Sequence, residues 1–253
     1  ASLARQGVNL VSNSILAIVL LLLPFLAHAG EEYAALFAKR TEYFDAVISP
    51  NGDYIAVERS ADEGKKLIAV VSTKDLRLLG HIPAGSDYSP FNALWASDER
   101  LIVQMTEDRD GSEFEFANGE LVSIDFDGKK RRQLIERQLG VYWYRDKPPL
   151  NALHGFAEVV HRLPNDENHV LIRLQEPSRS DLGQPPSLYR IHVVRGKVTR
   201  IADAPTYRAT FVFTPDGELV YCVGLDRESL KAGTNKWITH RFNEGNWEQL
   251  DKL

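Results

Sequence analysis

Short apolar runs separated by tight turns recur along this chain. The first such turn is Ser49-Pro50-Asn51-Gly52, which lies between strand-like runs at 44–49 and 54–59. Proline presets φ at the first central position of a turn, and Asn followed by Gly tolerates a positive φ. A turn of this chemistry between two strand-like runs predicts a β-hairpin.

Turns of this kind occur four times in the chain. Anchored on Pro50, Ser97, Pro164 and Pro215, the intervals between successive turns are 47, 67 and 51 residues. A second hairpin is predicted after each first one, from runs at 66–71 with 76–79, 120–126 with 133–135, 187–193 with 198–201, and 237–242 with 247–250. The chain is therefore a repeat of paired hairpins.

Each repeat is expected to form one four-stranded antiparallel sheet. Tyr189, Ile191 and Val193 alternate with Arg190 and His192, which is the pattern of a half-buried strand. Four strands per unit of about 45–50 residues are the signature of a propeller blade. A sandwich, the other all-β possibility, would not require the same turn at the same place in every unit.

We therefore predict an all-β fold, a β-propeller with about four four-stranded blades. The blades are expected at about 44–90, 91–140, 155–205 and 206–253, with 141–154 as an inserted loop. A propeller needs its last blade to meet its first, since otherwise strand edges and apolar blade faces stay bare. This pattern is more usual in larger rings, so the four blades are expected to be part of a seven- or eight-bladed ring in a longer chain.

The first residues are typical of an export signal. Arg5 precedes a run at 15–26 that is apolar except for Pro24, and Ala27-His28-Ala29 follows. A positive start, a short apolar middle and small residues at the end describe a cleaved secretory signal. The alternative is an uncleaved anchor, but a membrane-spanning helix needs about 20 apolar residues. We expect a signal peptide at 1–29 cleaved after Ala29, a periplasmic location, and a short helical lead-in at 30–43.

Composition and charge exclude some kinds of site and of binding partner. The 253 residues are 43% hydrophobic and carry a formal net charge of −5, with a single cysteine. This composition excludes a disulfide scaffold and a Cys-x-x-Cys metal or redox site. The acidic balance argues against sequence-independent binding of nucleic acid or anionic lipid. We expect no nucleic-acid partner, and membrane contact only through the export signal.

Motifs for catalysis, nucleotides and metals do not match the chain. No two glycines are four apart, so the nucleophile elbow Gly-x-Ser-x-Gly is excluded. Gly80 and Gly85 have P-loop spacing, but Ser86 stands where Lys is required. The segments 108–111 and 125–128 resemble calcium loops but lack the further acidic ligands. We expect no catalytic, cofactor-binding or metal-binding residues.

The histidines and the basic run of the chain are interpreted as structural features rather than as binding sites. His154, His161 and His169 are spaced too widely for a zinc site, so we expect them to face solvent or to be hydrogen-bonded. The basic run at 129–132 begins at a hairpin turn. It is expected to be a solvated edge that discourages strand pairing, with a binding patch as the alternative.

The remaining candidates are apolar or aromatic. Cys222 is predicted to be a small buried hydrophobic residue within a strand, and Trp95 and Trp237 are predicted to pack between blades. A long loop rich in aromatic residues and Arg is typical of contact surfaces. The candidate contact loop consists of Tyr142, Trp143, Tyr144 and Arg145. Packing of this loop on its own blade is the alternative.

The chain resembles a known family in its order of segments. An export signal and a helix at 32–40 are followed by the matching segments 43–52, 93–103, 121–128 and 163–172. They look like the N-terminal propeller of exported bacterial peptidases of the prolyl oligopeptidase family, which includes dipeptidyl and acylaminoacyl peptidases. In that family the propeller lies over a C-terminal α/β-hydrolase domain that carries the Ser-His-Asp triad, and it admits peptides while excluding folded proteins.

The resemblance implies a non-catalytic, substrate-gating portion of a serine peptidase that is inactive alone. Its expected partners are a peptide substrate and a hydrolase domain missing from these 253 residues, and no triad residue can be carried over. The Pro-Asp-Gly hairpins also occur in other exported propellers. The alternative is therefore a stand-alone TolB-like propeller that binds a protein or envelope component.

Overall fold

The computed structural model describes residues 42–61, 65–85, 88–107, 116–136, 153, 155–176, 178 and 182–250. Several predictions concern residues outside this part of the chain. They are the signal peptide at 1–29, the helical lead-in, the loop residues Tyr142, Trp143, Tyr144 and Arg145, the turn at 108–111, and His154. Within the described residues, no helix is long and apolar enough to cross a membrane.

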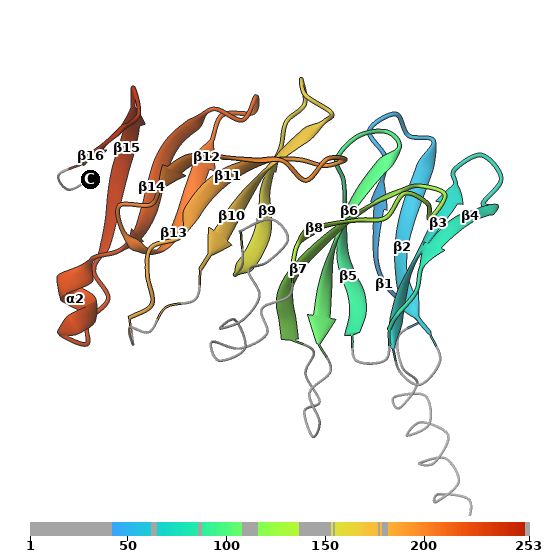
Figure 1. The fold of residues 1–253 in the computed structure, drawn as a ribbon, viewed down its shortest axis with the longest axis horizontal. Coiled ribbons are helices and arrows are strands. Elements are labelled where there is room, and N and C mark those ends of the chain that lie inside the picture. The colour runs from blue at the N-terminus through green and yellow to red at the C-terminus, as the bar shows by residue number, and fades with distance from the viewer. Residues whose placement is uncertain are drawn as a thin grey trace, which may run out of the picture. The chain divides into compact units, whose positions relative to one another are not determined.

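The strands form four antiparallel sheets of four strands each (Figure 1). Blade 1 contains β1 (Tyr43–Ile48), β2 (Tyr54–Ser60), β3 (Lys66–Ser72) and β4 (Leu78–Ile82). Blade 2 contains β5 (Tyr88–Trp95), β6 (Arg100–Glu107), β7 (Phe116–Asp125) and β8 (Arg132–Ile135). Blade 3 contains β9 (Phe156–Arg162), β10 (His169–Gln175), β11 (Ser187–His192) and β12 (Val198–Asp203). Blade 4 contains β13 (Tyr207–Phe213), β14 (Leu219–Leu225), β15 (Trp237–Asn243) and β16 (Asn246–Gln249).

Four four-stranded blades in chain order confirm the predicted all-β propeller architecture. In each sheet the strands are hydrogen-bonded in the order of the sequence, so every blade is a meander of consecutive hairpins. One short helix, α2 (Arg227–Lys231), separates β14 from β15 and was not predicted. Asp226 caps it, because its carboxylate accepts the backbone N–H of Ser229 at 2.9 Å.

The predicted turn chemistry is visible in the hydrogen bonds. The N–H of Gly52 donates to the carbonyl of Ser49 at 2.9 Å, and Gly52 has a φ of 79° that glycine adopts without strain. In blade 4, Gly217 donates to the carbonyl of Thr214 at 2.9 Å. The predicted start of β4 was wrong: Leu76, expected to begin this strand, lies in the turn before it with a φ of 54°.

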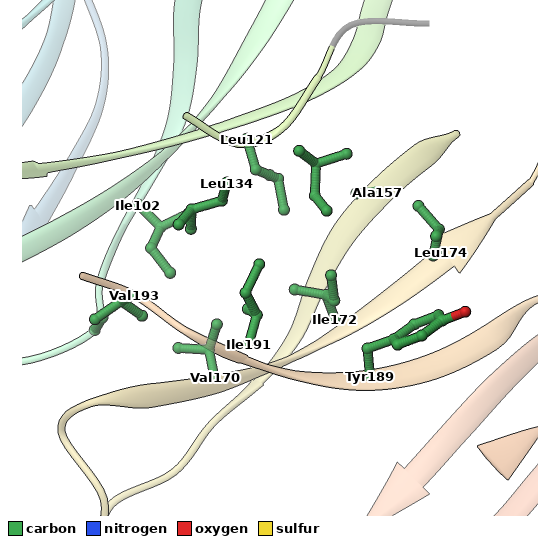
Figure 2. Packing of buried hydrophobic residues seen from close by; sticks show 12 residues of the cluster. Ile102, Leu121, Leu134, Ala157, Val170, Ile172, Leu174, Tyr189, Ile191 and Val193 are labelled. Atoms are coloured by element: carbon green, nitrogen blue, oxygen red, sulfur yellow. The ribbon is translucent and has the colours of Figure 1, made fainter. Parts of the chain in front are cut away.

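Each blade packs on the next through an apolar cluster. Ile68 and Val70 of blade 1 pack with Leu101 and Val103 of blade 2. Between blades 2 and 3 the cluster is larger, and Figure 2 shows how its aliphatic side chains from both blades meet. This cluster includes Ile102, Leu121 and Leu134 of blade 2 and Val170, Ile172 and Ile191 of blade 3. The cores therefore lie between blades, as the alternation of apolar positions requires.

The two tryptophans that were predicted to pack between blades behave differently. Trp95 is buried, belongs to the cluster between blades 1 and 2, and donates its indole N–H to the carbonyl of Val47 at 3.0 Å. This prediction is confirmed. Trp237 is 62% exposed, so its predicted packing between blades is not observed among the described residues and stays a prediction. It lies at the start of β15 and belongs to none of the apolar clusters of the described residues.

Polar side chains also join the second strand of a blade to the first strand of the next. The carboxylate of Glu58 accepts the N–H of Asn92 at 3.3 Å, and the amide of Gln104 donates to the carbonyl of Ala157 at 3.5 Å. The guanidinium of Arg173 donates through Nε to the carbonyl of Ala209 at 2.9 Å. These contacts hold the first strand of each following blade, and the start of that strand contributes to the candidate site.

Candidate functional site

A pocket of about 280 Å³ lies where the described parts of blades 3 and 4 meet. Its lining residues come from the start of β9 at Phe156, from the end of β10 with Glu176, Ser178 and 182–184, and from the start of β13 at Arg208. Gln175, Glu176 and Gln184 provide most of its polar wall. The lining residues thus include one with an aromatic ring and others with amide, carboxylate and guanidinium groups.

Hydrogen bonds hold the polar wall of the pocket in place. The amide Nε2 of Gln175 donates to the carbonyl of Gln184 at 2.6 Å. The amide of Gln184 lies 3.5 Å from Oε2 of Glu176, at the limit of a hydrogen bond. The side chain of Gln175 is therefore bound to the wall, whereas the carboxylate of Glu176 keeps lone pairs available for a ligand.

A glycine brings the first two segments together. Gly155 has a φ of 150°, and a Cβ built there would lie 2.4 Å from the carbonyl oxygen of Gln175. Only a residue without a side chain permits this approach of backbone to backbone. Phe156, which follows, pairs with Gln175 in the β9–β10 register and reaches the pocket wall.

Arg208 is the cation of the pocket, and its backbone is unusual. It lies at a register shift of β13 with a φ of 47°, a region that L-residues other than Asn and Asp rarely adopt. Asn92, at a bulge of β5, has the same φ. Arg208 is exposed, and within the described residues no hydrogen bond or ion pair of its side chain is formed. The guanidinium of this lining residue is therefore available to a ligand.

The histidines that the sequence singled out do not meet at one site. Nδ1 of His169 lies 2.9 Å from a carboxylate oxygen of Asp166, so this histidine is hydrogen-bonded as expected. His161 departs from the expectation, because its Nδ1 is buried without a partner and its ring packs on Phe213 at 5.4 Å. Among the described residues, no three side chains of His, Cys, Asp or Glu are grouped so that they could hold a metal.

Asp166 and its neighbours form a small charged cluster at the edge of blade 3. Burial raises the pKa of Asp166, but hydrogen bonds from His169 and Arg190 outweigh it and hold this pKa below its usual range. The ring of His192 lies 4.8 Å from that of His169, across the β10–β11 pair. Nδ1 of His192 accepts the N–H of Val194 at 3.2 Å, so the neutral imidazole stabilises the turn after β11.

Two histidines make the stability of the chain sensitive to acid. Burial, followed by the charges of His169 and Arg195, lowers the pKa of His192, and burial lowers the pKa of His240. The folded chain therefore binds these protons less readily than the unfolded chain, whose histidine pKa is about 6.5. The stability they contribute is complete above that pH and is lost as the pH falls through the lowered values.

We expect the free energy of unfolding in urea to fall between pH 7.5 and pH 5. In His192→Asn the amide oxygen can still accept the N–H of the turn but cannot titrate, so the fall should be smaller. Urea titrations of both proteins at the two pH values measure this difference. An equal fall in both proteins would show that His192 does not contribute.

The remaining candidates have structural roles. Cys222 is buried, as predicted, and burial raises its thiol pKa to about 12, so it is a thiol rather than a nucleophilic thiolate at neutral pH. In the basic run, Lys129 binds Asp127 at 2.8 Å and Lys130 binds Asp125 at 3.0 Å. Arg132 starts the outermost strand of blade 2, which agrees with a solvated edge.

The pocket was not foreseen from the sequence. Its walls come from two repeats, and neither Gln175 nor Arg208 belongs to a motif. The available signals were weak: a glycine directly before a strand at Gly155, and a long cationic residue at Arg208 inside an apolar run. The predicted contact loop, from Tyr142 to Arg145, lies outside the described residues and stays a prediction.

No protein-family model and no curated protein sequence matches the chain. Among solved structures, it is similar to an oligogalacturonate lyase in complex with manganese, with a TM-score of 0.51 at 12% identity over 84% of this chain and 54% of the lyase. At this identity the similarity shows a shared fold. The chain spans about half the length of that protein.

Similar structures also include a peptidase and a TolB protein. An acylaminoacyl peptidase from Pyrococcus horikoshii aligns with a TM-score of 0.47 at 11% identity over 83% of this chain and 32% of the peptidase. TolB from Acinetobacter baumannii aligns with a TM-score of 0.43 at 15% identity over 82% of this chain and 43% of TolB. These similarities do not decide between the two kinds of protein.

Proposed function

We propose that this chain is the non-catalytic, substrate-gating propeller portion of an exported serine peptidase that acts on short peptides. The observation that carries the proposal is the pocket between blades 3 and 4. Arg208, Glu176 and Phe156 all line this one small volume, and they carry a guanidinium, a carboxylate and an aromatic ring. A cation, an acceptor and an apolar surface together match the chemistry of a peptide end.

The sequence supports the peptidase assignment through its resemblance to the prolyl oligopeptidase family. In this proposal the Ser-His-Asp triad belongs to a hydrolase domain outside these 253 residues. The described residues contribute binding groups, and the thiol of Cys222 is held protonated by burial. The chain would therefore select peptides without cleaving them.

We expect the purified chain to bind short peptides and to leave them intact. Fluorescence anisotropy with labelled tripeptides to hexapeptides measures binding. Chromatography of the same mixtures after long incubation, together with labelling by a serine-directed phosphonate, measures catalysis. Hydrolysis accompanied by covalent labelling would contradict the non-catalytic assignment. A chain that is folded by circular dichroism but binds no peptide would contradict the gating assignment.

A second candidate function is a TolB-like propeller that binds an envelope protein. Blade 4 favours it, because Trp237 is 62% exposed and Val212 is 40% exposed, and exposed aromatic residues are common at protein interfaces. A stoichiometric complex with an envelope protein that is lost in Trp237→Ser, with no peptide binding, would support this function over the first.

A further inference from the structure

We infer that the pocket between blades 3 and 4 recognises the C-terminal residue of a peptide, with Arg208 binding the terminal carboxylate. This inference rests on the proposed peptide-gating function and adds which end of the peptide is bound. It follows from the charges of the pocket wall, from its size, and from the backbone conformation of Arg208.

The charges of the wall match a C-terminal residue. Such a residue carries an anionic carboxylate and an N–H donor on either side of one Cα atom, and its side chain projects from the same atom. Arg208 offers donors for the carboxylate in a planar fork, and Glu176 offers an acceptor for the N–H. Phe156 and Leu182 provide apolar surface for the side chain.

The volume of the pocket limits how much of a peptide it can hold. Pockets for drug-sized ligands have volumes of about 300–1,000 Å³. This pocket, at about 280 Å³, lies just below that range. It accommodates the end of a chain, and the remaining residues of a longer peptide would extend beyond it.

The backbone at Arg208 is the third observation. A left-handed conformation is unfavourable for an arginine, and such strain persists where the surroundings determine it. The hydrogen bond from Arg173 to the carbonyl of Ala209, the next residue, fixes this part of β13. The bulge thereby places a long cationic side chain in the pocket wall without an internal partner.

The comparison of Asn92 with Arg208 suggests a variant that separates binding from folding. Asparagine adopts the left-handed conformation more readily than arginine, and Asn92 does so in β5 with the same φ of 47°. Arg208→Asn removes the guanidinium and relieves the backbone. Its melting temperature should equal or exceed that of the parent chain. Arg208→Lys keeps a charge without the planar fork.

The experiment measures the affinity of the purified chain for three labelled peptides. They are Ala-Gly-Phe with a free C-terminal carboxylate, the same peptide with a C-terminal amide, and amidated Ala-Asp-Phe, which carries its carboxylate on a side chain. We expect the free acid to bind about 10- to 100-fold more tightly than either amide, the range expected for a charge-assisted pair. We expect Arg208→Asn to abolish this preference and Arg208→Lys to retain part of it.

Arg241→Gln is the matched control, because Arg241 is an exposed arginine of the same blade on β15. It should retain the preference for the free acid. Equal affinity of the parent chain for the acid and the amide would overturn the inference while leaving peptide gating intact. Equal affinity for the side-chain carboxylate, or an unchanged preference in Arg208→Asn, would also overturn it. Binding of no peptide would overturn the gating function itself.

Discussion

Ile172→Ala is expected to destabilise the chain by about 2–5 kcal/mol, the range for truncating a fully buried isoleucine. Ile172 has 0% exposure in the middle of β10 and belongs to the cluster between blades 2 and 3 (Figure 2). Removing its outer carbons leaves a cavity lined by both blades. Because two sheets would have to move together to fill it, we expect little relaxation and an effect in the upper part of the range.

Urea unfolding followed by far-ultraviolet circular dichroism measures this effect. Ile201→Ala is the matched control, since Ile201 is also an isoleucine of blade 3 but is 39% exposed on β12. The control should change the free energy of unfolding by much less. Similar changes in the two variants would show that the interface between blades 2 and 3 does not limit stability.

Arg100→Met is the second substitution with a large expected effect. Arg100 is 4% exposed, its guanidinium is paired with Asp125, and its Nε donates to the hydroxyl of Ser123 at 2.8 Å. The hydroxyl of Ser123 in turn donates to the carbonyl of Val193 in blade 3. Removing the cation leaves a carboxylate in a largely buried place and disturbs a contact between two blades.

Removing one partner of a buried ion pair lowers the free energy of unfolding by about 3–5 kcal/mol. We expect the lower end of this range, because Lys130 also lies 3.0 Å from Asp125 and the Asp125 side chain is 18% exposed. Arg100→Met combined with Asp125→Asn should recover much of the loss in the same urea titration. No recovery would mean that the packing of the Arg100 side chain, rather than the unpaired charge, accounts for the effect.

Arg77→Met is the control for this experiment. Arg77 and Asp75 form an exposed pair at 3.7 Å, and exposed pairs contribute little to stability. The control should therefore unfold at nearly the urea concentration of the parent chain. A loss as large as that of Arg100→Met would indicate that charge removal in general, rather than burial, is responsible.

Predictions made from local chemistry agree well with the structure. The turn at Gly52 depends on the conformations open to Asn and Gly, and the structure contains it as predicted. The buried position of Cys222 was predicted from the apolar character of a free cysteine within a strand, and the structure confirms it. Leu76 is an exception. A leucine next to a turn suggests the start of a strand, but in the structure Leu76 belongs to the turn itself and has a left-handed backbone conformation.

Predictions that depend on a neighbouring blade agree less well with the structure. Trp95 and Trp237 occupy similar apolar positions in the sequence, yet Trp95 is buried between blades 1 and 2 and Trp237 is exposed. Alternation shows that a side chain lies on one face of a sheet. It carries no information on whether another sheet covers that face.

The sequence by itself determined the repeat, the number of strands in each blade and the turns that connect them, because these depend on φ preferences and on the two-residue period of a strand. Only the tertiary structure decided the pocket. Phe156, Gln175 and Arg208 belong to different strands and have no shared motif, and they meet because two blades pack side by side through Leu171 and Phe211. A binding site between repeats depends on inter-blade packing, which acts between residues far apart in the chain.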